Sequence, residues 1–141
     1  MHTNTNRSTE SAITNGAWTL LLIAALWLMP EPAAARVHQQ WHDLLQQHVV
    51  AGAVDYQGFK RDEALLDDYL DWLAVYDPET LNEPDRLAFY INAYNAYTVK
   101  LILLNFSDGR PPSSIKKIGG LFQNPWKISF AVINNTTYTL D

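Results

Sequence analysis

The chain has 141 residues, of which 48% are hydrophobic, so its length and composition fit one globular domain rather than a disordered or fibrous chain. Its formal net charge of -5 argues against the clustered basic surface with which nucleic-acid-binding proteins hold phosphates. Cysteine is absent, which excludes disulfides, thiolate metal sites and a cysteine nucleophile.

The first 35 residues have the pattern of an export signal. Residues 17–29 form an apolar run of about 13 residues, which suits a signal peptide and falls short of the roughly 20 residues that span a bilayer. Prolines and then three alanines at 33–35 follow, as a signal peptidase site requires. We expect residues 1–35 to be a signal peptide, the mature chain to begin at Arg36, and the protein to be periplasmic or otherwise exported. Arg7 is the only Lys or Arg ahead of the apolar run, so an uncleaved membrane anchor stays open as the alternative.

Two helices are predicted in the first half of the mature chain. Apolar residues recur at helical spacing over residues 37–51, which predicts an amphipathic helix that ends at Gly52. Residues 52–59 are expected to form a turn or a short extended piece. Residues 62–76 predict a second helix, with leucines and tyrosines on one face and a solvated acidic face opposite.

A third helix, over residues 82–106, raises the main question about function. Asn82 fits its N-cap, and Pro84 fits its first turn. The helix is apolar almost all the way round, which predicts burial, yet Asn92 and Asn95 lie one turn apart in its middle. A buried amide without a partner costs about 1 to 3 kcal/mol, so we expect both to be hydrogen-bonded. The simpler partner is the backbone of a neighbouring loop, and the alternative is a ligand carbonyl or oxyanion in a pocket.

The last third of the chain predicts strands. Residues 107–114 are dense in turn formers and predict a loop, and residues 113–120 predict a short helical turn with serine as its N-cap. Strands are predicted over 127–133 and 136–140, joined by a tight turn at Asn134 and Asn135. Helices followed by a C-terminal hairpin predict an α+β fold for one domain over residues 36–141. Because a two-stranded hairpin is marginally stable alone, we expect this domain to be the front part of a larger one.

Three segments resemble, in order and spacing, the family called domain of unknown function 547. They are GAVDYQGF (52–59), LAFYINAYNAYTVKLIL (87–103) and SIKKIGGLFQNPWKISFAVINNTTYTLD (114–141). The INAYNA motif is the most specific of these, and the family's motif positions fall on Asn92, Tyr94, Asn95 and Ala96, and more loosely on Asp55, Tyr56 and Trp126. The resemblance implies no established activity. Because family members usually continue into a segment rich in Ile, Glu and His, it implies that this chain is truncated before that segment.

The remaining candidate residues have simpler structural interpretations. His38 and His42 have the spacing of two metal ligands on one helix face, but no third ligand is indicated, so we expect a solvated face. His48 falls on the apolar stripe of the first helix and is expected to be a partly buried core residue. Trp126 is expected to be a core aromatic, with a ligand-stacking platform as the alternative.

These observations favour an exported globular domain, uncharacterised as to activity, with a binding or structural role. Its expected binding residues are Asn92, Asn95 and Trp126, its expected ligand is a small molecule or a peptide, and no metal or cofactor is expected. Whether it is an enzyme stays open. One alternative is a hydrolase or amide transferase whose pocket is lined by Asn92 and Asn95 and completed by the missing C-terminal segment. Another is a membrane-anchored interaction module.

Overall fold

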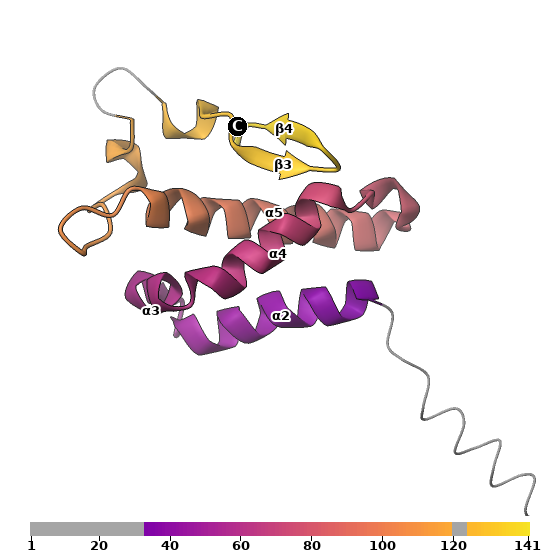
Figure 1. The fold of residues 1–141 in the computed structure, drawn as a ribbon, viewed down its shortest axis with the longest axis horizontal. Coiled ribbons are helices and arrows are strands. Elements are labelled where there is room, and N and C mark those ends of the chain that lie inside the picture. The colour runs from indigo at the N-terminus through magenta and orange to yellow at the C-terminus, as the bar shows by residue number, and fades with distance from the viewer. Residues whose placement is uncertain (1–32, 120–123) are drawn as a thin grey trace, which may run out of the picture. The chain divides into compact units, whose positions relative to one another are not determined.

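The structure is a computed structural model that describes residues 33–119 and 124–141 (Figure 1). The predicted α+β fold is confirmed. The helices are α2 (Ala33–His48), α3 (Tyr56–Arg61), α4 (Glu63–Val75) and α5 (Glu83–Leu104), with short 3-10 turns η1 (Pro78–Thr80), η2 (Ile115–Lys117) and η3 (Pro125–Lys127). Two antiparallel hairpins are formed by β1 (Val49–Val50) with β2 (Ala53–Val54), and by β3 (Ala131–Ile133) with β4 (Thr136–Tyr138). The expected signal peptide lies outside the described residues as far as position 32.

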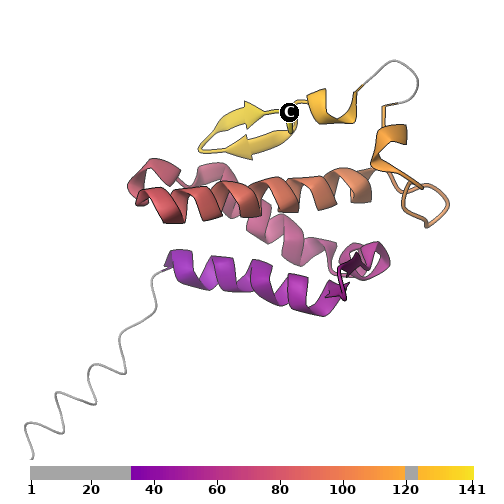
Figure 2. The same cartoon turned by 180° about the vertical axis from the view of Figure 1, so that it is seen from behind.

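The helices form a layered arrangement with α4 in its middle. Helix α4 packs against α2 on one side and against α5 on the other, and α3 also contacts α5. The hairpin β3–β4 lies on the opposite side of α5 from α2, and its strand β3 contacts α4 (Figures 1 and 2). Within the two described ranges, no helix is long and apolar enough to cross a membrane.

Aromatic side chains fill the space between the helices. The indole of Trp41 stacks on the ring of Tyr69, with centroids 5.6 Å apart and ring planes 5° from parallel. The largest side chains that are at most 1% exposed are Trp41, Phe59, Leu66, Tyr69, Leu73, Phe89 and Leu103. They come from α2, α3, α4 and α5, so burying aromatic area ties all four helices together.

The first helix ends earlier than its apolar pattern predicts. Helix α2 stops at His48, because Val49 and Val50 turn into strand β1 and pair with β2. Ala51 and Gly52 join the two strands with φ of 50° and 79°, left-handed values that glycine adopts without strain and that are uncommon for alanine. The β-branched valines favour this extended conformation over another helical turn. The following helix α3 was not predicted, since residues 52–59 read as a turn.

The second and third helices agree with their predictions to within two residues at each end. Leu66, Tyr69, Leu70 and Leu73 of α4 are buried on one face. The Asn82 side chain caps α5 by accepting a hydrogen bond from the Asp85 N–H at 3.0 Å, and Pro84 lies in the first turn. Local capping chemistry therefore fixes where α5 begins.

The C-terminal hairpin is shorter than expected. Lys127, the first residue of the predicted strand, instead ends the turn η3, which begins at Pro125 and is capped by Asn124, and strand β3 starts only at Ala131. Asn134 and Asn135 have φ of 46° and 57°, as the predicted tight turn requires. The turn is bound to α4, since the Asn135 N–H donates to the Ala74 carbonyl at 2.6 Å.

Candidate functional site

The expectation that Asn92 and Asn95 are buried is wrong. Asn95 is exposed and Asn92 is half-buried, and neither lines either of the two hollows described below. Helix α5 buries one face, which includes Ala93 and Ala96, while Ile91 on the other side is 52% exposed. The apolar residues around α5 thus do not all face protein, and the exposed Asn95 needs no buried partner for its amide.

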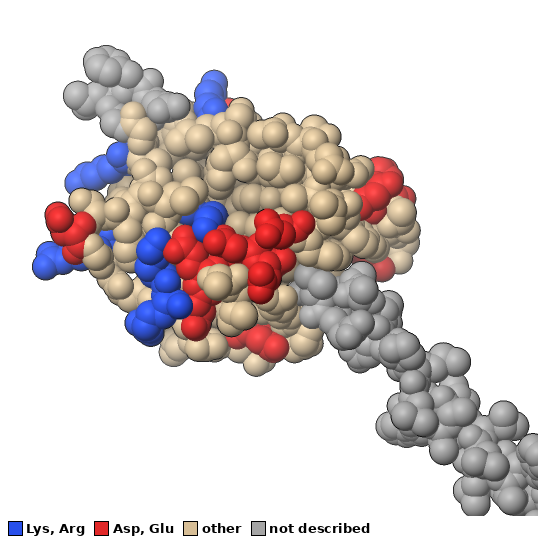
Figure 3. All heavy atoms as spheres, viewed as in Figure 1, with Lys and Arg blue, Asp and Glu red and all other residues tan. Residues whose placement is uncertain are grey.

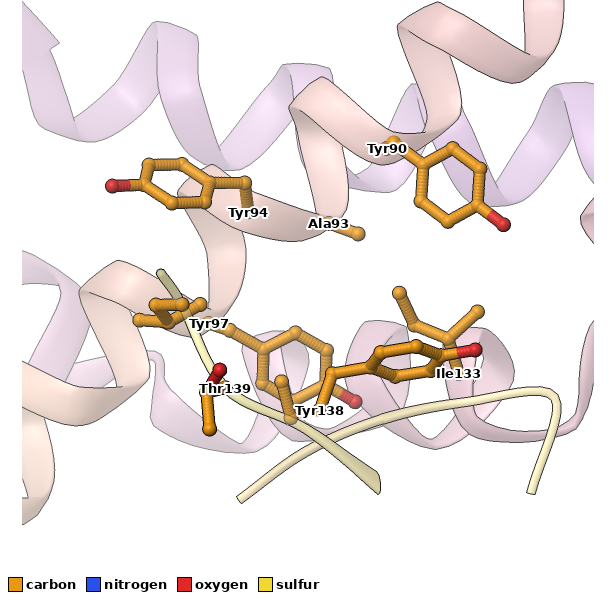
Figure 4. A pocket seen from close by; sticks show the side chains of 9 residues that line it. Tyr90, Ala93, Tyr94, Tyr97, Ile133, Tyr138 and Thr139 are labelled. Atoms are coloured by element: carbon orange, nitrogen blue, oxygen red, sulfur yellow. The ribbon is translucent and has the colours of Figure 1, made fainter. Parts of the chain in front are cut away.

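The structure instead places an apolar groove between α5 and the β3–β4 hairpin, which we call the tyrosine groove. Its volume is about 230 Å³. Figure 4 shows Tyr90 and Tyr94 on one side, and Tyr97, Ile133, Tyr138 and Thr139 on the other. The complete lining is Tyr90, Ala93, Tyr94, Tyr97, Ala131, Ile133, Tyr138, Thr139 and Leu140.

Trp126 stands behind one wall of this groove. Its ring is stacked on Tyr94, with centroids 6.4 Å apart and planes within 11°. Its backbone carbonyl accepts a hydrogen bond from the Leu140 N–H at 2.9 Å, which ties η3 to the chain that follows β4. Trp126 is half-buried and does not line the groove itself, so its geometry is that of a residue that positions Tyr94.

Among the described residues, the groove carries hydroxyl groups but no side chain suited to acid–base catalysis at neutral pH. Its described lining includes no carboxylate, imidazole or amine. Burial raises the pKa of Tyr90, and the nearby Glu79 and Asp77 carboxylates raise it further, against the opposing charge of Arg86. Burial likewise raises the pKa of Tyr97, whose hydroxyl donates to the Val132 carbonyl at 2.6 Å. Both phenols therefore remain protonated hydrogen-bond donors near neutral pH.

A second hollow lies on the other side of the hairpin, between α4, α5 and β3. Its volume is about 520 Å³, and it is lined by Asp67, Leu70, Asp71, Ala74, Tyr97, Lys100, Leu104, Phe130 and Val132. Figure 3 shows acidic and basic side chains gathered together on this face of the molecule. Lys100 lies 2.8 Å from Glu63 Oε1 and 2.5 Å from Asp67 Oδ1. The acidic face of α4 is therefore partly ion-paired rather than simply solvated. The sequence pattern did not reveal that Lys100 is its partner.

The histidines do not form a metal site in the described residues. No group of three His, Asp or Glu side chains there could hold a metal ion. His42 is exposed as expected, but His38 is half-buried, with its ring edge against Trp72 at a centroid distance of 5.3 Å. Burial lowers the pKa of His38, and Asp85 opposes that shift. His48 is a core residue as predicted, but it is buried more completely than expected, at 3% exposed, and its Nε2 lies 2.9 Å from Asp62 Oδ2.

Comparison with family models, curated proteins and solved structures finds no match for this chain. The fold and the groove by themselves define the class of molecule as an α+β domain with an aromatic surface groove.

Proposed function

We propose that this chain is a binding domain that receives apolar side chains of a peptide, or a small apolar molecule, in the tyrosine groove. The observation that carries the proposal is the groove's lining, which joins four tyrosines to aliphatic side chains without an acid or base that titrates near neutral pH. Tyrosine suits binding surfaces because it offers a large apolar ring and one hydroxyl that can hydrogen-bond.

The volume of the groove favours side chains over a whole drug-sized molecule. At about 230 Å³ it is smaller than the roughly 300 to 1,000 Å³ of pockets that enclose such ligands. One or two side chains of a longer ligand fill such a space, with the rest of the ligand outside. Aromatic contacts of this kind contribute about 0.5 to 1.5 kcal/mol beyond the area that they bury.

Of the three predicted binding residues, Trp126 and Asn95 have a role in this proposal and Asn92 has none. Trp126 holds the Tyr94 ring by stacking, so it acts through Tyr94. Asn95 follows Tyr94 on the exposed surface of α5, where its amide is free to contact a ligand that extends beyond the groove. Asn92 is half-buried outside the groove, and we give it no contact with the ligand.

We also propose that the chain is an exported member of the domain of unknown function 547 family. Support comes from the order of the three resembling segments and from the signal-like pattern of residues 1–35. Expression in a bacterium with the natural N-terminus, followed by N-terminal sequencing of the purified protein, tests export. A start at Arg36 supports it, and retention of Met1 in membranes supports the anchored alternative.

The binding proposal is tested by calorimetry and thermal shift against apolar peptides and against the dye anilinonaphthalene sulfonate. Tyr94→Ala and Tyr138→Ala should each weaken binding about tenfold, the effect of roughly 1.4 kcal/mol. Ile91→Ala is the matched control, since Ile91 is an exposed apolar residue of α5 like Tyr94 but lies outside the groove. Equal affinity of all three variants would refute the site. Turnover of a peptide that Asn95→Ala abolishes would instead support the hydrolase alternative.

A further inference from the structure

Strand β4 has a backbone edge that faces away from β3. The two-residue turn at Asn134 and Asn135 makes Ile133 and Thr136 the first hydrogen-bonded pair of the hairpin. In the next pair, Val132 and Thr137, the backbone N–H and C=O groups point away from the partner strand, because antiparallel pairs alternate. Thr137 therefore presents its N–H and C=O on the outer edge of β4.

The outer edge of β3, unlike that of β4, already has a hydrogen-bond partner within the described protein. The Val132 carbonyl accepts the Tyr97 hydroxyl at 2.6 Å, as its outward direction requires. No described residue makes the equivalent contact with Thr137, and all three residues of β4 are exposed. Strand β4 contains neither a charged residue nor a proline, the residues that commonly prevent another strand from pairing with an exposed edge.

This free edge belongs to the same side of the hairpin as the tyrosine groove. Tyr138 of β4 and the following Thr139 and Leu140 line the groove, whereas the second hollow is lined from the hairpin by Phe130 and Val132. A chain that pairs with β4 would therefore run beside the groove. Since alternate residues of a strand point to the same face of a sheet, every second side chain of the added strand would face the tyrosine groove.

We propose that the occupant of this edge is an extended peptide, which adds antiparallel to β4 as a third strand and places apolar side chains in the tyrosine groove. This inference rests on the proposed binding function and specifies its ligand. Main-chain hydrogen bonds to Thr137 hold the strand, and the groove selects the side chains. A groove of about 230 Å³ takes one or two of them.

Charge at the turn end of the groove specifies one further feature of the peptide. The carboxylates of Glu79 and Asp77 both contribute to the raised pKa of Tyr90, and Arg86 pairs with Glu79 at 3.0 Å. Asp77 accepts a hydrogen bond from the Asn134 side chain at 3.4 Å and has no cation paired with it among the described residues. This end therefore carries an excess negative charge, which favours a Lys or Arg at the peptide's C-terminal end, the end that antiparallel pairing brings to the turn.

The net charge of the chain argues against a second copy of it as the occupant of this edge. Each copy has a net charge of -5, so pairing two copies opposes like charges. A neutral or cationic peptide meets no such opposition.

The test uses the labelled peptide fluorescein-Val-Thr-Val-Thr-Val-Lys-amide and measures binding by fluorescence polarisation. Thr137→Pro removes the outward N–H without touching a hydrogen bond to β3, and should weaken binding about tenfold, as loss of a main-chain bond does. Thr137→Val keeps that N–H and should bind within about twofold of the wild type. A peptide N-methylated at alternate residues should also lose about tenfold on the unmodified protein, and replacing its Lys with Glu should weaken binding more at low salt than at high salt.

The outcomes separate this inference from the proposed function. If Tyr94→Ala weakens peptide binding while Thr137→Pro and N-methylation do not, the groove binds side chains and strand addition is wrong. If only anilinonaphthalene sulfonate binds in a Tyr94-dependent way, the groove stands and the peptide is wrong. A wild-type dimer in light scattering that Thr137→Pro dissociates would assign the edge to a second copy and overturn the peptide. If neither probe binds, both proposals fail.

Discussion

Replacing Lys100 with methionine removes the central cation of an ion-pair network that joins α3, α4 and α5. Lys100 contacts Glu63 at 2.8 Å and Asp67 at 2.5 Å, and Glu63 also pairs with Lys60 at 2.6 Å. The Lys100 side chain is 16% exposed and that of Glu63 is 22% exposed. The contribution of the Lys100–Glu63 pair to stability should therefore fall between two limits. An exposed ion pair contributes about 0.2 to 1 kcal/mol, and breaking a buried one costs about 3 to 5 kcal/mol.

We expect Lys100→Met to lower the free energy of unfolding by about 1.5 kcal/mol near neutral pH, after allowance for the retained Lys60 and for solvent screening. For a domain of this size that corresponds to a melting temperature lower by roughly 6 to 12 °C. Lys60→Met is the comparison variant, because Lys60 pairs with the same Glu63 but is 40% exposed. Its expected loss is smaller, at about 0.5 kcal/mol.

The effect should depend on pH. Burial disfavours the ionised form of Glu63, but hydrogen bonds from Lys100 and Lys60 and their charges outweigh it and hold the pKa of Glu63 below its ordinary value. Its stabilising contribution is therefore complete above the unfolded pKa of about 4.3 and is lost as pH falls through the folded pKa. Burial also disfavours the Lys100 ammonium, yet its bonds to Asp67 and Glu63 raise the pKa of Lys100, so its contribution persists throughout that acidic range.

Thermal unfolding of the wild type, Lys100→Met and Lys60→Met, followed by circular dichroism at neutral pH and at about pH 3.5, measures both effects. The gap between the wild type and Lys100→Met should narrow at the acidic pH. Equal melting temperatures for the two variants at neutral pH, or a gap that does not change with acid, would show that burial does not strengthen this network.

Three further stability predictions follow from contacts in the core and the hairpin. Gly58→Ala would place a methyl group against the His48 ring, so it should destabilise by about 1 to 3 kcal/mol, and His48→Ala in the same chain should recover part of that loss in denaturant melts. Leu66→Ala should lower the free energy of unfolding by about 2 to 5 kcal/mol, because Leu66 is 0% exposed, whereas Leu65→Ala at a 46% exposed position should change it by less than about 0.5 kcal/mol. Tyr97→Phe removes the hydrogen bond to the β3 carbonyl, so it should cost about 0.5 to 1.5 kcal/mol and speed amide exchange in the hairpin.

Local sequence signals predicted much of the helical framework. The cap at Asn82, the proline in the first turn and the turn at Asn134 and Asn135 depend only on neighbouring residues, and each has its predicted role. The ends of α2 and β3 were less well predicted, because they depend on which partner strand the chain meets. Pairing of residues 49–50 with 53–54 ends the first helix, although its apolar pattern continues.

The site was harder to predict, because α5 is apolar almost all the way round and its hydropathy therefore does not identify the side that faces water. Asn92 and Asn95 drew attention as polar residues in an apolar helix, yet their side of α5 is accessible. The tyrosines of the groove come from α5 and from the hairpin, and the pairing of those two elements has no local signal. One clue was available: Tyr90 and Tyr94 are four residues apart and Tyr97 follows three later, a spacing that puts them along one side of the helix.

The Tyr97 ring is a wall shared by the tyrosine groove and by the charged hollow on the far side of the hairpin. Its hydroxyl is fixed to the backbone of β3, so the ring cannot turn without moving that strand. A guest that displaces the ring on one side must reshape the space on the other, where Lys100 and Asp71 stand. The two hollows thus share one wall, so a guest that moved the Tyr97 ring in the tyrosine groove would also alter the space beside Lys100 and Asp71.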